Sequence, residues 1–169
     1  SRSNSMQLGF AAIVAARAVK EGKTLDEVKE IAEANVRRSR FLFIPDNLIY
    51  LQKGGRIGGA SAIIGNVLKI IPVLTVENGT TTILKTVRTK AKAIMAMMDK
   101  TLQDHLDYGL REIAVHHINC YDQAQDLANN LREKLKMDVT ISDIGPVIGL
   151  HVGPGAIGIV YYTEKDMRG

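Results

Sequence analysis

The sequence has no tryptophan, few other aromatic residues and a single cysteine among its 169 residues. Because one cysteine, Cys120, excludes an internal disulfide framework and suits a reducing compartment, we expect a cytoplasmic protein. The shortage of aromatic side chains removes the stacking surfaces that bind single-stranded nucleic acids. The net charge of +4 is dispersed, and its densest group, Arg37, Arg38 and Arg40, is explained more simply as a solvated helix end. We therefore expect no nucleic acid partner.

Long apolar runs are also absent, so the sequence predicts no segment that crosses a membrane. The first residues lack the basic stub, apolar core and cleavage site of a secretory signal. An apolar content of 46% and a charged content of 24% are typical of a globular domain. The chain opens at Ser1 without an initiator methionine and enters a helical pattern almost at once, so we interpret it as part of a longer protein.

Hydrophobic periodicity and turn residues predict alternating helices and strands. Helices are expected at 6–20 capped by Ser5, after the capping box Thr24–Glu27, after Asp46, at 60–68, from Thr89 to about Gly109, and at 121–136. Strands are expected at 41–44, 69–77, 80–87, 112–118, 139–144 and 156–162, with Asn78-Gly79 as a hairpin turn. This order predicts an α/β (α+β) fold with a mixed or antiparallel sheet and flanking helices.

Residues 51–59 read Leu-Gln-Lys-Gly-Gly-Arg-Ile-Gly-Gly, with four glycines around Lys53 and Arg56. Glycine allows a ligand to approach the backbone closely, and the arginine guanidinium matches two oxygens of a carboxylate or phosphate. The segment therefore favours a site for an anionic group. An equally simple interpretation is a helix that ends at Gly54 and is followed by a solvated arginine.

A second glycine-rich segment, residues 145–155, is expected to be a loop with His151 inside it. A neutral imidazole forms a hydrogen bond with a carboxylate, and a protonated one pairs with a phosphate. The flanking glycines Gly149, Gly153 and Gly155 favour a functional role. The alternative is a histidine whose polar atoms are satisfied within the loop.

No catalytic or metal-binding pattern accompanies these two segments. His116 and His117 are neighbours on a predicted strand and point to opposite faces, so they do not easily share an ion, and no second cluster completes a set of four ligands. The sequence has no nucleophile elbow, no phosphate-binding loop and no dinucleotide fingerprint. We expect neither an enzyme nor a metal or cofactor site.

Taken together, the motifs resemble the bacterial DegV family. The resemblance rests on Leu51-Gln-Lys-Gly-Gly-Arg-Ile, Ile71-Pro-Val-Leu, Lys85-Thr-Val-Arg-Thr, the segment from Ile144 to Gly155, and the opening Ser-Arg-Ser-Asn-Ser-Met-Gln-Leu-Gly. It implies a two-domain protein that binds one long-chain fatty acid between its domains. In some members this protein is the acyl-carrying subunit that presents the carboxylate to a separate fatty acid kinase. The carrier itself would perform no chemistry.

The resemblance also implies roles for parts of this chain. Residues 1–45 would be the tail of the N-terminal domain, and residues 46–169 would be the C-terminal domain. Arg56 and His151 would bind the head group, and the motif loops would contribute Lys53, Gly54, Gly55, Gly153 and Gly155. Candidates for the wall around the acyl chain are Ile63, Ile64, Val67 and Leu68, for each of which ordinary core packing is the alternative.

Two other functions stay open at this point. One is an enzyme acting on a small phosphorylated ligand, with Arg56 as a phosphate clamp. The other is a regulatory interaction module whose basic surface docks an acidic partner. Because the helix at 6–20 is apolar nearly all round, an uncovered flank would leave an apolar patch, and self-association of the chain is a further expectation.

Overall fold

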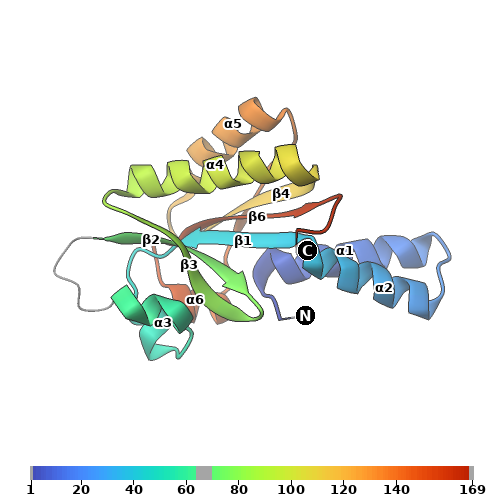
Figure 1. Ribbon diagram of the computed structural model, residues 1–169, viewed down its shortest axis with the longest axis horizontal. Coiled ribbons are helices and arrows are strands. Elements are labelled where there is room, and N and C mark those ends of the chain that lie inside the picture. Colours follow the sequence, from blue (N-terminus) through green and yellow to red (C-terminus); the bar gives the residue numbers. More distant parts are fainter. Residues whose placement is uncertain (1, 64–69, 168–169) are drawn as a thin grey trace.

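A six-stranded mixed sheet runs through the middle of the computed structural model, which describes residues 2–63 and 70–167 (Figure 1). The strand order is β3-β2-β1-β6-β4-β5. The strands are β1 (Ser39–Ile44), β2 (Ile71–Glu77), β3 (Thr80–Val87), β4 (Leu110–His117), β5 (Thr140–Asp143) and β6 (Ile157–Thr163). Neighbouring strands are antiparallel except β4 and β5, which are parallel. The predicted fold class, mixed α/β with flanking helices, is confirmed.

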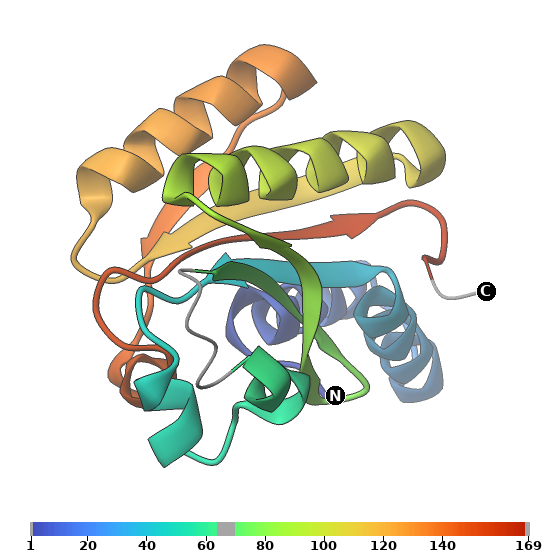
Figure 2. The ribbon, with the colours of Figure 1, turned by 60° about the vertical axis from the view of Figure 1, so that its left-hand side comes forward.

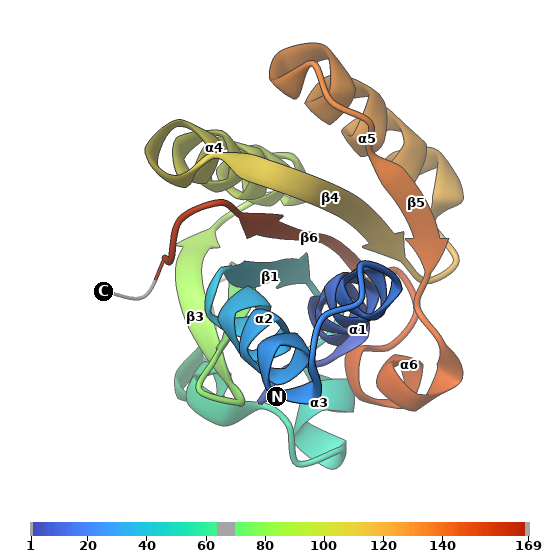
Figure 3. The same cartoon turned by 90° about the vertical axis from the view of Figure 1, so that its right-hand side faces the viewer.

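Helices cover both faces of the sheet (Figures 2 and 3). They are α1 (Ser5–Lys20), α2 (Leu25–Arg37), α3 (Ile49–Lys53), a 3-10 helix η1 (Gly58–Ile63), α4 (Lys90–Tyr108), α5 (Tyr121–Leu135) and α6 (Pro146–Val152). The long helices α4 and α5 lie on one face, whereas α1, α3 and α6 lie on the other, with α2 packed on α1. Within residues 2–63 and 70–167, none of the helices combines the length and apolar character that crossing a membrane requires.

Strand β1 is buried on both faces because it lies in the middle of the sheet. Its alternate residues Leu42 and Ile44 join the core under α4 and α5, whereas Phe41 and Phe43 join a second core with Phe10 of α1. The boundary expected at residue 45 therefore falls directly after a central strand of this sheet. The division into two domains at that point stays a prediction.

Several local signals act as expected. Asn78 and Gly79 connect β2 and β3 with φ values of 51° and 81°, the left-handed pair that a two-residue hairpin turn requires. The capping box of Thr24 and Glu27 is complete at the start of α2. The hydroxyl of Thr89 accepts a hydrogen bond from the backbone N–H of Lys92 at the start of α4.

Two predicted caps are wrong. Asn4, not Ser5, occupies the cap position of α1, and the Ser5 hydroxyl instead lies 3.2 Å from Nε2 of His116. Asp46 does not cap α3, because Asn47 lies closer to the helix and its side chain accepts the N–H of Ile49 at 2.8 Å. Asp46 turns instead toward Lys90. Ser5 contacts a residue that is remote in sequence, and at α3 the nearer side chain of Asn47 makes the bond that was expected of Asp46.

Two predicted segments also differ from the structure. The glycine-rich segment 145–155 is not a continuous loop, because Pro146 begins the short helix α6. Proline suits the first helical position, where its missing N–H is not needed. The helix expected at 60–68 is a 3-10 helix from Gly58 to Ile63, and residues 64–68 of that prediction lie outside the described residues.

A buried carboxylate joins α4 to the sheet. Asp104 of α4 is fully buried, and its oxygens lie 2.8 Å from Nε of Arg40, 2.7 Å from Nζ of Lys100 and 2.6 Å from the hydroxyl of Tyr161. Burial, and then the Asp104 charge, raise the pKa of Tyr161 well above its usual value, so this hydroxyl stays a donor. The network joins side chains from β1, β6 and α4 around one carboxylate.

We expect Asp104→Ala to lower the free energy of unfolding by about 3 to 5 kcal/mol, because it leaves a buried phenol and a guanidinium without their acceptor. Urea unfolding of the full-length protein measures the change. The control is Asp99→Ala, at an exposed position of the same helix, which should stay within about 0.5 kcal/mol of the wild type. Equal losses in the two variants would contradict the role of the network.

A second polar network fixes the mostly apolar helix α1 on the sheet. Arg17 of α1 pairs with Glu112 of β4, which also accepts a hydrogen bond of 2.7 Å from the Tyr162 hydroxyl of β6. Burial alone would raise the pKa of Glu112, but the hydrogen bonds from Arg17 and Tyr162 lower it overall. Burial, followed by the bond to Glu112, raises the pKa of Tyr162 to about 12.

These shifts predict a pH dependence with a definite sign. Folding raises the pKa of the Tyr162 hydroxyl from 10.0 to about 12. The contribution of this hydroxyl to stability is therefore present below pH 10.0 and is lost as the pH rises toward about 12. We expect the stability difference between wild type and Tyr162→Phe to shrink from about pH 8 to about pH 11. Urea midpoints across this range measure the difference. A constant difference would show that the phenol does not titrate with folding.

Candidate functional site

Arg56 and His151, which sequence reasoning singled out from two separate segments, line the same pocket. The pocket has a volume of about 360 Å³. Its apolar wall is formed by side chains of β1, α3, β2 and α6, namely Phe41, Phe43, Leu51, Val76, Val147, Ile148 and Val152. The two polar motif residues therefore meet beside an apolar surface.

Arg56 follows the end of α3. The helix ends at Gly54, as one interpretation of the sequence predicted, and the Arg56 N–H donates to the carbonyl of Leu51 at 2.8 Å. The guanidinium is exposed, and its only hydrogen bond among the described residues is a long one of 3.3 Å from Nη1 to the Gly54 carbonyl. Because no carboxylate pairs with it there, its fork is available for an anionic ligand.

His151 lies in the last turn of α6. Its Nδ1 atom is buried and has no hydrogen-bond partner within the described part of the chain. That nitrogen packs directly against Gly54, so close that a Cβ atom at residue 54 would overlap it. The Nε2 edge of the ring is consequently the edge that a ligand in the pocket can reach.

The two motif segments fit together through their glycines. Gly54 receives the His151 ring, and Gly153 in turn receives the ring of Tyr50 from α3. Gly153 has a φ of 75°, so a side chain there would be strained as well as blocked by Tyr50. The ring of each segment thus packs on a glycine of the other segment. This reciprocal packing holds together the two segments that carry Arg56 and His151.

Uncharged polar groups complete the lining. Asn4, Thr80 and Thr81 border the pocket, and no aspartate or glutamate is among its described lining residues. Sequence reasoning missed these three residues because they belong to a helix start and a hairpin that are remote in sequence. The pocket therefore combines one permanent positive charge, one imidazole and several neutral donors with an apolar wall. Such a site suits an amphiphile with an anionic head group.

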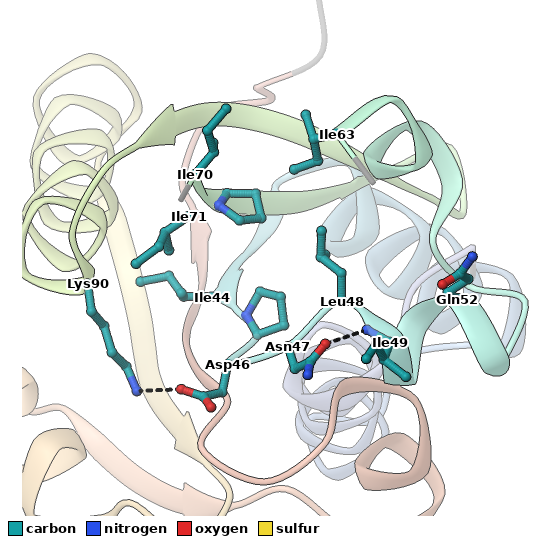
Figure 4. A pocket seen from close by; sticks show the side chains of 12 residues that line it. Ile44, Asp46, Asn47, Leu48, Ile49, Gln52, Ile63, Ile70, Ile71 and Lys90 are labelled. Atoms are coloured by element: carbon teal, nitrogen blue, oxygen red, sulfur yellow. Dashed lines mark hydrogen bonds and ion pairs between the residues drawn. The ribbon is translucent and has the colours of Figure 1, made fainter. Parts of the chain in front are cut away.

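The residues expected to form the acyl-chain wall are not part of the described lining of this pocket. Ile63 lines a different pocket, of about 310 Å³, which has neither Arg56 nor His151 in its lining (Figure 4). The other candidates, Ile64, Val67 and Leu68, lie outside the described residues. The apolar wall beside Arg56 includes Phe41 and Phe43 of β1, and the alternation of these residues along the strand was the available sequence signal.

The glycines and lysine of the two motifs have separate positions. Gly55 lines the pocket, and Gly54 and Gly153 form the packing surfaces described above. Gly155 lies against Asp46, and Lys53 is an exposed residue at the end of α3 that is not part of the pocket lining. Gly54, Gly153 and Gly155 are therefore explained by packing between the segments, whereas Gly55 has a φ of 66° and open space around it, and Lys53 faces solvent.

His116 and His117 lie on opposite faces of β4, as their spacing predicts. His116 contacts Ser5 and the carbonyl of Ser142, and burial lowers its pKa. His117 lies 3.5 Å from the carboxylate of Asp143. Within residues 2–63 and 70–167, no group of three or more metal-type side chains is placed to hold an ion.

Comparison with known proteins identifies the family. The model of the DegV family, described as uncharacterised proteins, matches residues 1–164, and the chain belongs to this family. A DegV domain-containing protein of Clostridium acetobutylicum is 65% identical over 168 residues, which are 99% of this chain and 59% of that protein. A second one, of Clostridium perfringens, is 42% identical over 165 residues, or 98% of this chain and 58% of that protein.

Solved structures agree with this assignment. The fatty acid binding DegV family protein of Streptococcus agalactiae matches with a TM-score of 0.84 and 30% identity, over 93% of this chain and 56% of that one. DegV of Bacillus subtilis, a fatty acid binding protein, matches with a TM-score of 0.82 and 32% identity, over 96% and 58%. The chain thus spans less than two thirds of the length of these relatives.

The contact between Gly54 and His151 leads to a testable prediction. We expect Gly54→Ala to displace the His151 ring, with a destabilisation of about 1 to 3 kcal/mol, because the new methyl group would occupy the space of Nδ1. The ring resonances of His151 in NMR spectra report its displacement.

The matched control is Gly145→Ala, because a Cβ atom there would meet nothing within 4 Å. This variant should leave the His151 resonances in place. Unmoved resonances in Gly54→Ala would show that the glycine does not position the ring.

Proposed function

We propose that the protein is a cytoplasmic carrier that binds a long-chain fatty acid and presents its carboxylate to a partner fatty acid kinase. Arg56 and His151 would bind the carboxylate, and the apolar wall beside them would contact the acyl chain. The observation that carries the proposal is the meeting of these two residues in one pocket without an acidic neighbour among its described lining. The fatty acid binding described for the relatives of known structure supports it.

The apolar wall and the head-group residues contribute unequally to the free energy of binding. Each methylene removed from water contributes about 0.8 kcal/mol, so a long acyl chain supplies most of the affinity. A hydrogen bond to a charged head group contributes only about 1.5 to 3 kcal/mol. We infer that the wall sets affinity, whereas Arg56 and His151 set orientation.

The pocket also favours an amphiphile over a small phosphorylated ligand. A phosphate-binding enzyme needs polar partners on most sides of its ligand, because each unpaired polar group loses its hydration. Here the lining that surrounds Arg56 and His151 is largely apolar and includes Phe41, Phe43 and Val76. In the proposed function this chain contributes binding, and the chemistry belongs to the kinase.

The first experiment is lipid extraction from the purified full-length protein. We expect mass spectrometry to find a fatty acid at about one per chain, because burial of the acyl chain makes release slow. Arg56→Ala and His151→Ala should each weaken binding by roughly tenfold to 100-fold, as expected for the loss of one bond to a charged group. The control is Arg88→Ala, at an exposed position outside the pocket.

The same variants test the hand-off to a kinase. With a partner kinase, acyl phosphate production should fall further in Arg56→Ala and His151→Ala than lipid retention does, because orientation is lost before affinity. A protein that is consistently empty of lipid would refute the carrier. Unchanged turnover in both variants would refute the roles given to Arg56 and His151.

A further inference from the structure

Lys90 makes contact with both segments that carry the head-group residues. Its Nζ atom lies 3.7 Å from Oδ1 of Asp46 and donates a hydrogen bond of 3.2 Å to the carbonyl of Gly155. Figure 4 shows Lys90 and Asp46 facing each other at the edge of the second pocket. Asp46 belongs to the connection that leads from β1 to Arg56, and Gly155 to the connection that follows His151.

The two connections also touch directly at this point. Gly155 has a φ of 78°, and a Cβ atom there would come within 3.0 Å of the Asp46 side chain. Lys90 thus lies across a junction where the backbone of one connection meets a carboxylate of the other. Together with the packing of His151 on Gly54, this junction holds the two connections at a second place.

Lys90 is fixed more firmly than the segments it joins. It begins α4, a helix of 19 residues that packs on β1, β2, β3 and β6. Helices α3 and α6 have only 5 and 7 residues, too few to be stable without tertiary contacts. The positions of Arg56 and His151 therefore depend on what holds these short helices, and α4 is a rigid support.

We propose that Lys90 is a positioning residue that clamps the Arg56 segment to the His151 segment and thereby slows the release of a bound fatty acid. This role rests on the proposed function. The bond to the Gly155 carbonyl is charge-assisted and partly buried, whereas the pair with Asp46 is partly exposed and sensitive to salt. Either contact alone is weak, but the clamp acts on both segments at once.

The release of a fluorescent fatty acid tests the clamp. Full-length protein is loaded with parinaric acid and mixed with excess fatty-acid-free albumin, and the decay of fluorescence gives the release rate. Lys90→Met should release the probe roughly fivefold to tenfold faster. Lys90→Arg should restore the rate to within about twofold, because it retains a charged donor of similar length.

The matched control is Lys92→Met, at an exposed position of α4 with no side-chain partner among the described residues. It should release the probe at a rate within about twofold of the wild type. Added salt should speed release from the wild type more than from Lys90→Met, because the pair of Arg56 with the carboxylate is screened in both proteins and the Lys90–Asp46 pair only in the wild type. A wild-type rate in Lys90→Met overturns the proposal, and so does equal acceleration in Lys90→Arg.

A second measurement separates the clamp from the proposed function. Hydrogen exchange of the lipid-free protein should become faster in Lys90→Met within residues 46–57 and 145–156, and stay unchanged in the core strands. Unchanged exchange in those two segments overturns the clamp. If the wild type takes up no parinaric acid, the carrier function is refuted, while the exchange data still decide whether Lys90 joins the two segments.

Discussion

The packing of the His151 ring on the bare backbone of Gly54 is the contact on which the pocket depends. It brings two segments that are almost one hundred residues apart in sequence to van der Waals distance, and it tolerates no side chain at residue 54. Arg56 follows two residues later, so the same contact brings the backbone that carries Arg56 close to His151. Gly54 and Gly153 are thus explained by packing between the two motifs.

The sheet provides the platform for this contact. Alternation along β1 sends Leu42 and Ile44 to the core under α4 and α5, and it sends Phe41 and Phe43 to the pocket side. The core on the first face holds α4 in place, which in turn presents Lys90 to both motif segments. Stability on one face is therefore linked to the geometry of the site on the other.

The buried network around Asp104 and the pocket with Arg56 differ in how their charged groups are paired. Asp104 is fully buried and has three side-chain partners, because an isolated carboxylate in the core would be prohibitively costly. Arg56 has no carboxylate partner among the described residues, and the buried Nδ1 of His151 has no hydrogen bond there. Unpaired positive and polar groups beside an apolar wall are what the proposed binding of an anionic amphiphile requires.

The sequence by itself determined the elements whose signals are local: the hairpin at Asn78-Gly79, the capping box at Thr24, the alternation of β1, and the two glycine motifs with Arg56 and His151. Only the tertiary structure decided that these motifs share a pocket, that Phe41 and Phe43 form its wall, and that Lys90 joins the two segments. The physical reason is the distance along the sequence between the residues that interact. Turns, caps and periodicity depend on neighbours within a few residues, whereas the pocket depends on long-range packing that no local pattern records.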